Sequence, residues 1–417
     1  MDSKTSTQPR IIIIGAGFAG LTAAHELKKN KNIEITLIDK NNYHTFQPFL
    51  YQVASADLAP SDIAIPIRSE FKGYENVHVI MGEVTRVDKE NREICLKDGK
   101  IINYDYLIIA TGSEVNYFNH PEWSKYVVSL KTINDALLIR TKVLEAFEKA
   151  EIDKKNFVTF TIIGGGPTGV ELAGSLYELI KQTLKDEFNY VNPNDSKIIL
   201  IEASEKLLSS FNKKLSDFTV DSLERKGITL KLGIRVKDLT KNLVILENGE
   251  IIDTQLIIWA AGVKASLSKD ILGNDVEFSH GNKIKVEPNF SLENYPNIFV
   301  IGDSAEYLDK KGESLPGLAA VASQEGKFIS KVIFAKINNK DAPKKFIYNN
   351  RGNLAIIGRY SAIYEFGKIK LKGWLAWLIW DVVHIYFLIG FRNRIIVFIK
   401  WIWNYITHRR SERLIIK

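Results

Sequence analysis

This sequence of 417 residues contains only one cysteine, Cys95. A single thiol cannot form a disulfide within the chain, which excludes dithiol relays of the CxxC kind. The residues around Cys95 alternate between polar and apolar, as in a strand. We therefore interpret Cys95 as a small buried hydrophobic residue rather than a reactive one.

Long uncharged hydrophobic runs are also missing. The most apolar segment, residues 370–417, is interrupted by Asp381 and by three basic residues, so it lacks the roughly 18 uncharged residues of a membrane-spanning helix. Residues 1–10 are polar and lack the apolar core of an export signal, which favours a cytoplasmic start. Because no calcium loop, Walker turn, metal-ligand cluster or nucleic-acid motif is found, we expect no bound metal and no nucleic-acid partner.

The composition is that of a globular protein of two or three domains, with 45% hydrophobic residues. Lys and Arg number 56 against 49 Asp and Glu, which gives a formal net charge of +7. The basic excess is concentrated near the C-terminus and suggests an anionic surface as partner. The residues concerned are Arg392, Arg394, Lys400, Arg409, Arg410 and Arg413.

A strand-length apolar run, Ile11–Ile14, leads into the glycine-rich turn Gly15-Ala16-Gly17-Phe18-Ala19-Gly20. Helical spacing of apolar residues follows, so the segment has the strand, turn and helix of a dinucleotide cradle. A second apolar run ends in Asp39, close to the roughly 20-residue spacing at which a carboxylate binds an adenosine ribose. The alternative is a glycine-rich turn without a ligand.

The same pattern recurs later in the chain. A strand at residues 160–163 enters Gly164-Gly165-Gly166-Pro167-Thr168-Gly169, and the run 197–201 ends in Glu202. The longer interval before this acid is explained by an extended helix at 176–182 and a loop at 192–195. We therefore expect two dinucleotide sites. A carboxylate at Glu202 would repel a 2′-phosphate, which favours NADH over NADPH.

These patterns predict an α/β protein with two Rossmann-like dinucleotide-binding domains and a C-terminal amphipathic helical region that anchors the chain to a membrane. The first domain is expected in two parts, residues 9–115 and 271–345, around a second domain at 116–270 with a core at 157–265. The C-terminal region is expected at 346–417.

The motifs resemble the flavoprotein superfamily with two dinucleotide-binding domains, over roughly residues 9–330. The resemblance rests on the two glycine-rich turns, on Thr111-Gly112 and on Gly302-Asp303. It implies tightly bound FAD in the first site and NADH as electron donor in the second. The implied FAD ligands are Gly15, Ala16, Gly17, Phe18, Ala19, Gly20, Asp39, Lys40, Val84, Thr111, Gly112, Asp303, Ala319 and Ala320. The implied NADH ligands are Gly164, Gly166, Pro167, Thr168, Gly169, Glu202 and Gly262.

A closer resemblance is to the type II NADH:quinone oxidoreductases, which are respiratory and do not pump protons. It rests on the segments 42–54, 165–174 and 318–326. The last segment is similar to the family's AQxAxQQG quinone motif, but Ala320 and Glu325 replace two of its glutamines. Gln324 and Gln52 are the quinone-site candidates that the resemblance implies, and Glu325 could face either solvent or the site.

Glu171 is the catalytic residue that this resemblance implies. In the family the matching glutamate lies between the nicotinamide and flavin sites. A carboxylate is best used in quinone reduction, because forming quinol takes two protons whereas hydride transfer needs stacking. The alternative is structural, because an acid in the first turn of a helix stabilises the macrodipole by roughly 0.3–1 kcal/mol.

The C-terminal segment combines tryptophans and other aromatic residues with basic residues, which is typical of amphipathic helices lying in one leaflet. We therefore expect residues 370–413 to bind an anionic lipid surface. The aromatic residues are Trp374, Trp377, Trp380, Phe387, Phe391, Trp401, Trp403 and Tyr405. The alternative is a buried dimerisation or docking helix. Asp381 and His384 share a helix face and could pair with each other.

The sequence thus predicts an FAD enzyme that oxidises NADH and reduces a membrane quinone. We expect a homodimer bound peripherally to the cytoplasmic side of a prokaryotic inner membrane. One rival function is an NADH-dependent reductase of a soluble electron-carrier protein. Another is a slow flavin redox sensor, which the substitutions at Ala320 and Glu325 encourage.

Overall fold

Isoleucine-rich strands form the centres of two parallel sheets in the computed structural model, which describes residues 8–267, 269–407 and 409–415. The chain divides into two compact units. Unit 1 comprises residues 1–44, 65–114 and 263–349, and unit 2 comprises residues 45–64, 115–262 and 350–417. The short strands β3 (Tyr43–Thr45), β4 (Ala64–Pro66), β10 (Ser113–Val115) and β19 (Val263–Ala265) lie where the chain passes from one unit to the other.

Unit 1 contains a six-stranded sheet in the order β21-β22-β9-β1-β2-β5. All neighbouring strands are parallel except the β21 and β22 pair. The apolar run Ile11–Ile14 lies in the middle strand and is fully buried, as expected for a strand covered on both faces. The strands are β1 (Arg10–Ile14), β2 (Glu34–Asp39), β5 (Val77–Met81), β9 (Tyr106–Ile109), β21 (Ser291–Leu292) and β22 (Tyr295–Val300).

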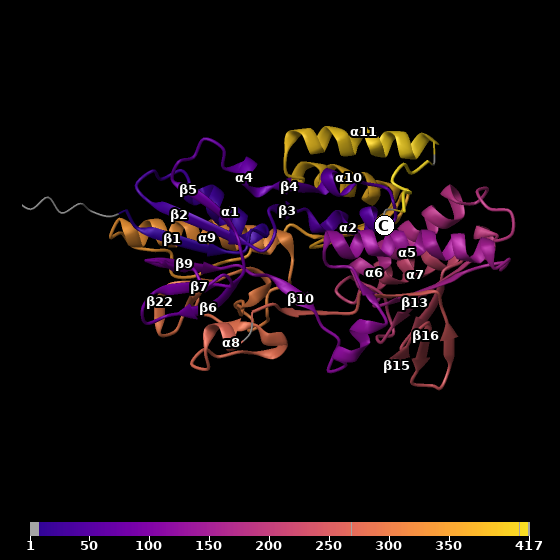
Figure 1. Ribbon diagram of the computed structural model, residues 1–417, viewed down its shortest axis with the longest axis horizontal. Helices are drawn as coiled ribbons and strands as arrows, with labels where there is room; N and C mark the ends of the chain where they lie inside the picture. The colour runs from indigo at the N-terminus through magenta and orange to yellow at the C-terminus, as the bar shows by residue number, and fades with distance from the viewer. Residues whose placement is uncertain (1–7, 268, 408, 416–417) are drawn as a thin grey trace, which may run out of the picture. The chain divides into compact units, whose positions relative to one another are not determined.

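Helices α1 (Phe18–Leu27) and α9 (Ala319–Ile337) pack against each other beside this sheet (Figure 1). Gly326 on α9 makes the approach close, because a Cβ there would lie 2.4 Å from the carbonyl oxygen of Ala19. An antiparallel sheet of β6 (Val84–Asp88), β7 (Glu93–Leu96) and β8 (Ile101–Asn103) completes the first half of the unit. The short elements are α4 (Ile67–Glu70), α8 (Lys269–Leu272), β20 (Ile284–Lys285) and β23 (Ala305–Glu306).

Unit 2 repeats this plan. Its five-stranded sheet, in the order β11-β18-β12-β13-β14, is parallel throughout. An antiparallel sheet of β15 (Val236–Thr240), β16 (Leu243–Leu246) and β17 (Ile251–Asp253) corresponds to the one in unit 1. The parallel strands are β11 (Val128–Ser129), β12 (Thr159–Ile163), β13 (Lys197–Glu202), β14 (Thr229–Leu232) and β18 (Leu256–Trp259). The expected fold of two Rossmann-like domains is therefore confirmed.

The helices of unit 2 that accompany this sheet are α5 (Ile133–Ile152), α6 (Pro167–Glu178) and α7 (Lys213–Arg225). Helix α6 continues into a π-helical turn, Leu179–Thr183, so the extended helix expected from the sequence is present but changes type at its end. Residues 45–64 contribute the short helices α2 (Leu50–Ala54) and α3 (Pro60–Ile63). No regular spacing of apolar residues in this segment predicts either helix.

The C-terminal part of unit 2 begins with an antiparallel sheet of β24 (Asn353–Gly358), β25 (Ser361–Phe366) and β26 (Ile369–Gly373). Strand β24 packs on α6 at Gly174, where a Cβ would lie 2.0 Å from the carbonyl oxygen of Ile357. Helices α10 (Trp374–Phe387) and α11 (Phe391–Thr407) follow and lie side by side (Figure 1). Within the described ranges, no helix is long and apolar enough to cross a membrane.

Candidate functional site

The glycine-rich turn of unit 1 joins β1 to α1. Gly15 has a positive φ of +100°, and a Cβ there would lie 2.3 Å from the carbonyl oxygen of Ala110. A Cβ on Gly20 would lie 1.9 Å from the carbonyl oxygen of Gly15. Gly17, in contrast, faces open space, with no atom within 4 Å of its Cβ position. The first and third glycines therefore allow close packing, and the second leaves room for a phosphate beside the N-terminus of α1.

Asp39 lies at the end of β2 and reaches this turn. Its Oδ2 accepts a hydrogen bond of 2.7 Å from the backbone N–H of Ala16, and its Oδ1 accepts one of 2.8 Å from that of Asn41. The carboxylate is thus oriented by two backbone donors beside the glycine-rich turn. Of the other FAD candidates, Lys40 is exposed and forms an ion pair of 3.0 Å with Glu83, and Val84 begins β6.

A buried histidine lies beside the same turn. His44 places Nδ1 2.7 Å from the carbonyl oxygen of Ala16, so Nδ1–H is the donor and Nε2 carries the lone pair. Nε2 is buried and has no hydrogen-bond partner among the described residues. Burial lowers the pKa of His44, which keeps the ring neutral. An unused acceptor beside a glycine cradle fits a ligand that carries hydroxyl groups, as a dinucleotide does.

The turn of unit 2 has the same geometry. Gly164 has a φ of +116°, and a Cβ on Gly169 would lie 1.8 Å from the carbonyl oxygen of Gly164. Gly166 again faces open space. Glu202 at the end of β13 accepts a bond of 2.6 Å from the N–H of Gly165 and bonds of 2.8 and 2.7 Å from the N–H and Oγ of Ser204. Pro167 opens α6, where its missing N–H costs nothing. Thr168 is exposed in the first turn of α6, and Gly262 lies at the end of the unit's central strands.

Asp303 lies in unit 1, directly after Gly302, whose φ is +73°. Its Oδ2 accepts a hydrogen bond of 2.7 Å from Ser113 Oγ. The hydroxyls of Ser304 and Thr111 are 2.9 Å apart, and Ser304 also donates to the carbonyl of Gly112 at 3.0 Å. The Thr111-Gly112 and Gly302-Asp303 turns, which are far apart in sequence, are therefore tied together. Ala319 and Ala320 form the first turn of α9.

Glu325 was expected to face either solvent or the quinone site, but it lies beneath the turn at Gly302. Its side chain is buried, and one oxygen accepts the hydrogen bond of the Gly302 N–H at 2.5 Å. Burial raises the pKa of Glu325 to about 8, with a further increase from Asp303 and an opposing effect of Lys283. Asp303, Gly317 and Glu325 line one small cavity of unit 1. Glu325 thus supports the turn that carries Asp303.

Glu171 lies in unit 2 on α6, beyond the first turn of the helix, which contains no acid. Glu171 therefore does not compensate the helix dipole, which was the structural alternative for this residue, because that effect is confined to the first turn. One oxygen of Glu171 accepts a long hydrogen bond of 3.4 Å from the N–H of Ile356 in β24. Desolvation raises the pKa of Glu171 to about 8, so the carboxyl is largely protonated at neutral pH.

The two glutamine candidates have partners within their own units. Gln52 on α2 is buried, accepts a hydrogen bond of 2.8 Å from Trp401 Nε1 and donates one of 2.9 Å to Tyr51. Gln324 on α9 is bound at both ends of its amide by the backbone of Asn349, at 3.1 and 3.0 Å. Each amide is thus fixed in orientation by the surrounding protein.

Several basic residues near the C-terminus form ion pairs with acids of the chain itself, which corrects the interpretation of the whole cluster as a lipid-binding surface. Arg410 is buried against Glu178 and Asp57, and Lys400 forms ion pairs of 2.7 and 3.1 Å with Asp62 and Glu412. Arg413 pairs with Glu187. Arg392 and Arg409 are exposed, whereas Arg394 donates to the carbonyl of Leu388.

The aromatic residues of α10 and α11 divide between two faces. Trp380 and Trp401 are buried and pack on Phe49, so their assignment to a membrane belt was wrong. The expected pair of Asp381 and His384 is also wrong, because Asp381 bonds Tyr405, whereas His384 Nδ1 is 2.8 Å from the Trp380 carbonyl. The opposite face exposes large apolar side chains: Trp374, Leu375, Leu378, Val382, Tyr386, Phe387, Phe391, Ile395, Phe398, Ile399, Ile402, Trp403 and Ile406.

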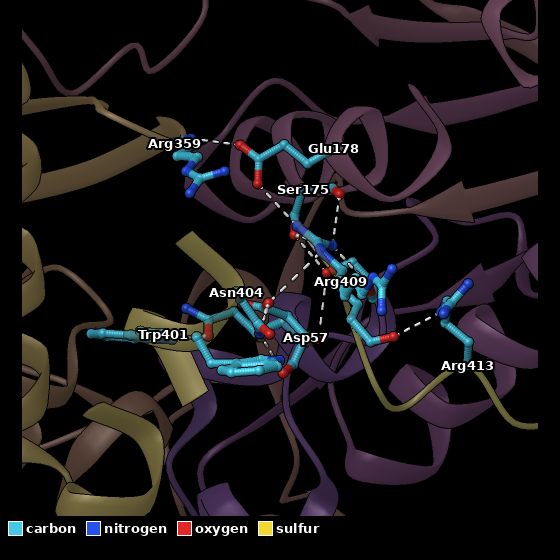
Figure 2. Close-up of polar contacts among 12 residues, drawn as sticks. Asp57, Ser175, Glu178, Arg359, Trp401, Asn404, Arg409 and Arg413 are labelled. Carbon is cyan, nitrogen blue, oxygen red and sulfur yellow. Dashed lines mark hydrogen bonds and ion pairs between the residues drawn. The ribbon is translucent and has the colours of Figure 1, made fainter. Parts of the chain in front are cut away.

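Sequence reasoning missed the polar cluster in which Asp57, Ser175, Glu178 and Asn404 meet (Figure 2). These residues come from α6, α11 and the loop after α2, and Arg410 joins them. No spacing rule reveals such a cluster, because its members are far apart in the chain. The only signal in the sequence was the presence of charged residues within apolar segments.

Comparisons with known proteins agree with this geometry. The family described as pyridine nucleotide-disulphide oxidoreductase matches residues 9–326, and the NDH2 C-terminal domain matches residues 350–410. The type II NADH:quinone oxidoreductase Ndh of Mycobacterium tuberculosis is 34% identical over 97% of this chain and 89% of its own length. The type II NADH:quinone oxidoreductase NdhA of the same organism is 36% identical over 99% of this chain and 90% of its own length.

Among solved structures, NDH2 from Plasmodium falciparum in complex with NADH matches with a TM-score of 0.88 and 25% identity, covering 98% of this chain and 100% of that chain. Sulfide:quinone oxidoreductase from Aquifex aeolicus matches with a TM-score of 0.74 and 20% identity over 93% and 92% of the two chains, which shows the shared fold. On the strength of the family matches and of these relatives, the chain belongs to the pyridine nucleotide-disulphide oxidoreductases and, within them, to the type II NADH:quinone oxidoreductases.

Proposed function

We propose that this protein oxidises NADH through FAD and reduces a quinone to quinol without pumping protons, with FAD held in unit 1 and NADH in unit 2. The observation that carries the assignment is the repeated geometry of the two turns. In each unit an acid at the end of a strand is held by the N–H that follows the first glycine, and the middle glycine faces open space. Bound FAD supplies the acceptor for the hydride and the donor of two electrons.

The donor is NADH rather than NADPH. Glu202 has both oxygens held at the turn of unit 2, which supports its role as the acceptor for the 2′-hydroxyl of an adenosine ribose. A ribose hydroxyl can donate a hydrogen bond to this carboxylate. A 2′-phosphate would instead bring two anionic groups together and leave the ribose without its acceptor.

Glu171 supplies a proton in the quinone half of the reaction. Its carboxyl is neutral at neutral pH because it is desolvated, and the long bond to Ile356 restrains it weakly. A neutral carboxyl can release its proton to a quinone oxygen and regain one from water. Tyr51 stays protonated because burial raises its pKa, so the phenol adds no competing charge near Glu171.

Gln52 and Gln324 are the candidates for the quinone side of the site. Gln52 is tied to Trp401 on α11 and to Tyr51, and so it links the C-terminal helices to α2. Gln324 lies in the first half of α9, close in sequence to Ala319 and Ala320. In both cases the amide is preorganised, so a quinone oxygen would meet a group whose rotamer is already set.

The protein acts at a membrane surface, on which α10 and α11 lie. The apolar face of these helices is exposed and rich in aromatic residues, as an interfacial helix requires, and Arg392 and Arg409 are available for anionic headgroups. The protein binds peripherally to the cytoplasmic side of a prokaryotic inner membrane. It forms a homodimer. Support for the dimer comes from the family resemblance alone.

A direct test is anaerobic turnover with NADH and a short-chain quinone. One quinol is expected for each NADH consumed, with a strong preference for NADH over NADPH. In sealed vesicles with the enzyme on the outer face, turnover should take up one proton per NADH from the outer medium and leave the pH of the lumen unchanged, because no proton crosses the membrane. Oxidation of NADH with a soluble electron-carrier protein but not with any quinone would overturn the assignment and establish the rival reductase function.

A further inference from the structure

The guanidinium of Arg410 lies buried between two helices of unit 2. Nη1 donates to the carbonyl of Ser55 at 2.7 Å and to that of Ser175 at 3.0 Å. Nη2 donates to Glu178 at 2.9 Å, and Nε lies 3.7 Å from Asp57. One side chain from the C-terminal tail therefore contacts both α6 and the residues that end α2. Ser175, Glu178 and Asp57 converge at this place in Figure 2.

The contacted residues lie close in sequence to Gln52 and Glu171, two of the candidates for the quinone half of the reaction. Ser55 is the C-cap of α2, the helix that carries Gln52, and Ser175 lies one turn after Glu171 on α6. The hydroxyls of Ser55 and Ser175 are 2.5 Å apart. Ser175 also accepts a second, longer bond from Arg410 at its Oγ. The spacing between Gln52 and Glu171 is thus fixed by this contact and by Arg410 across it.

Arg410 also balances the negative charges of Asp57 and Glu178. Asp57 and Glu178 are both largely shielded from solvent, and their ion pairs are with Arg410. Asn404 from α11 donates to Asp57 at 2.7 Å, and the N–H of Arg359 donates to Glu178. Without the guanidinium, two carboxylates would lie close together in a poorly hydrated space, which is unfavourable unless the helices separate or a proton is taken up.

We propose that Arg410 is a positioning residue for quinone reduction, because it holds α2 and α6 at the separation that Gln52 and Glu171 require. The inference rests on the proposed function of these two residues. Arg410 itself touches neither of them. Its effect on the reaction is therefore geometric, and it is confined to the half-reaction that uses both helices.

The test compares Arg410→Gln and Arg410→Lys with Arg225→Gln, which removes the same charge from an exposed arginine at the end of α7. Holoenzyme is mixed anaerobically with NADH and then with a short-chain quinone, and the absorbance of the flavin band is followed. For Arg410→Gln we expect the NADH step within about twofold of wild type and the quinone step slowed roughly 10- to 100-fold, as misplacement of reacting groups by about 1 Å produces. Arg410→Lys should be intermediate, and Arg225→Gln should match wild type in both steps.

A second readout does not depend on turnover. Hydrogen–deuterium exchange should rise in residues 50–57 and 175–183 of Arg410→Gln, because the contacts of Arg410 with both segments are lost. It should stay unchanged in Arg225→Gln. Equal slowing of both half-reactions would show that Arg410 only stabilises the fold. Unchanged quinone kinetics would also overturn the proposal.

Glu178→Gln keeps the test decisive if Arg410→Gln does not fold. This variant retains the side-chain shape and removes the charge that holds Arg410 to α6. It should slow the quinone step selectively. The double variant Arg410→Lys/Glu178→Gln should be no slower than the slower of the two single variants, because both substitutions break the same contact. Additive effects would contradict the proposal. If wild type is bleached by NADH but does not recover with quinone, the proposed function fails instead, independently of these variants.

Discussion

Glu202 Oε2 accepts a hydrogen bond of 2.6 Å from the backbone N–H of Gly165, and this contact repeats in unit 2 what Asp39 and Ala16 do in unit 1. The repetition includes the residue two positions after each acid, because the backbone N–H groups of Ser204 and Asn41 each donate a hydrogen bond to the other carboxylate oxygen. Both carboxylates are therefore rigidly oriented before any ligand binds. A preorganised acceptor of this kind discriminates against a ligand that lacks the matching hydroxyl group, because the carboxylate is then left without a hydrogen-bond donor.

Glu202→Gln should reduce the preference for NADH over NADPH. The amide keeps the size of the side chain but loses the charge that repels a 2′-phosphate. The expected change in the ratio of kcat/KM values corresponds to about 1.5–3 kcal/mol, the usual range for a hydrogen bond to a charged group. Steady-state kinetics with both nucleotides measure it. Glu205→Gln, a change at an exposed acid nearby, is the control and should leave the ratio unchanged.

The quinone step should depend on pH through Glu171. Its pKa is raised to about 8, so the protonated form that can donate is present at neutral pH and is lost as the pH rises through that value. We expect the rate of flavin recovery with quinone to fall above about pH 8 in wild type. In Glu171→Gln the rate should be low and flat across the same range. A wild-type profile without this decline would contradict the assigned role.

Glu325 should make the folded protein less stable as the solution becomes alkaline. Its folded-state pKa of about 8 lies above the ordinary 4.5, so its stabilising effect is complete below 4.5 and lost as the pH rises through 8. Glu325→Gln keeps an acceptor for the Gly302 N–H but cannot ionise. The melting temperature of Glu325→Gln minus that of wild type should therefore grow as the pH rises from about 5 to about 9.

A change that removes the acceptor at Glu325 has a different consequence. In Glu325→Leu the N–H of Gly302 loses its partner, which costs about 1–3 kcal/mol for a buried donor. Because Asp303 follows Gly302 directly, we expect purified Glu325→Leu to retain less FAD than Glu325→Gln. Flavin content per chain measures this. Equal retention would show that the turn does not depend on the bond.

Membrane binding should depend on the exposed face of α11. Replacing Ile399 and Trp403, which are 58% and 61% exposed, by serine removes apolar area from this face without opening the core. We expect sedimentation with vesicles containing anionic lipid to fall, because interfacial binding scales with buried apolar area. The control is Ile152→Ser at the end of α5, where the side chain is 79% exposed. Equal binding by both variants would place the membrane contact elsewhere.

The fold could be predicted from the sequence wherever local pattern and tertiary environment agree. Ile11–Ile14 is a continuous apolar run, and the parallel sheet buries it on both faces. Gly15 and Gly164 were recognisable because their turns demand positive φ and leave no room for a side chain. The helix α2 was not predictable, because a helix as short as Leu50–Ala54 has no detectable period and forms through its tertiary contacts.

The site was less predictable where charges find distant partners. Arg410 and Lys400 belong to a basic cluster that suggests a lipid surface, but Glu178 and Asp62, which bind them, are remote in sequence. Trp401 likewise resembles an interfacial residue, whereas it donates to Gln52 inside the protein. Composition indicates that such residues are unusual for their segment. Only the folded structure shows whether water, lipid or another side chain satisfies them.

The most direct test of the central claim is anaerobic stopped-flow absorbance of wild-type holoenzyme at the flavin band, with NADH added first and a short-chain quinone second. The account predicts rapid bleaching by NADH and rapid, complete recovery with quinone. Bleaching without recovery would remove quinone as the acceptor and contradict the assignment.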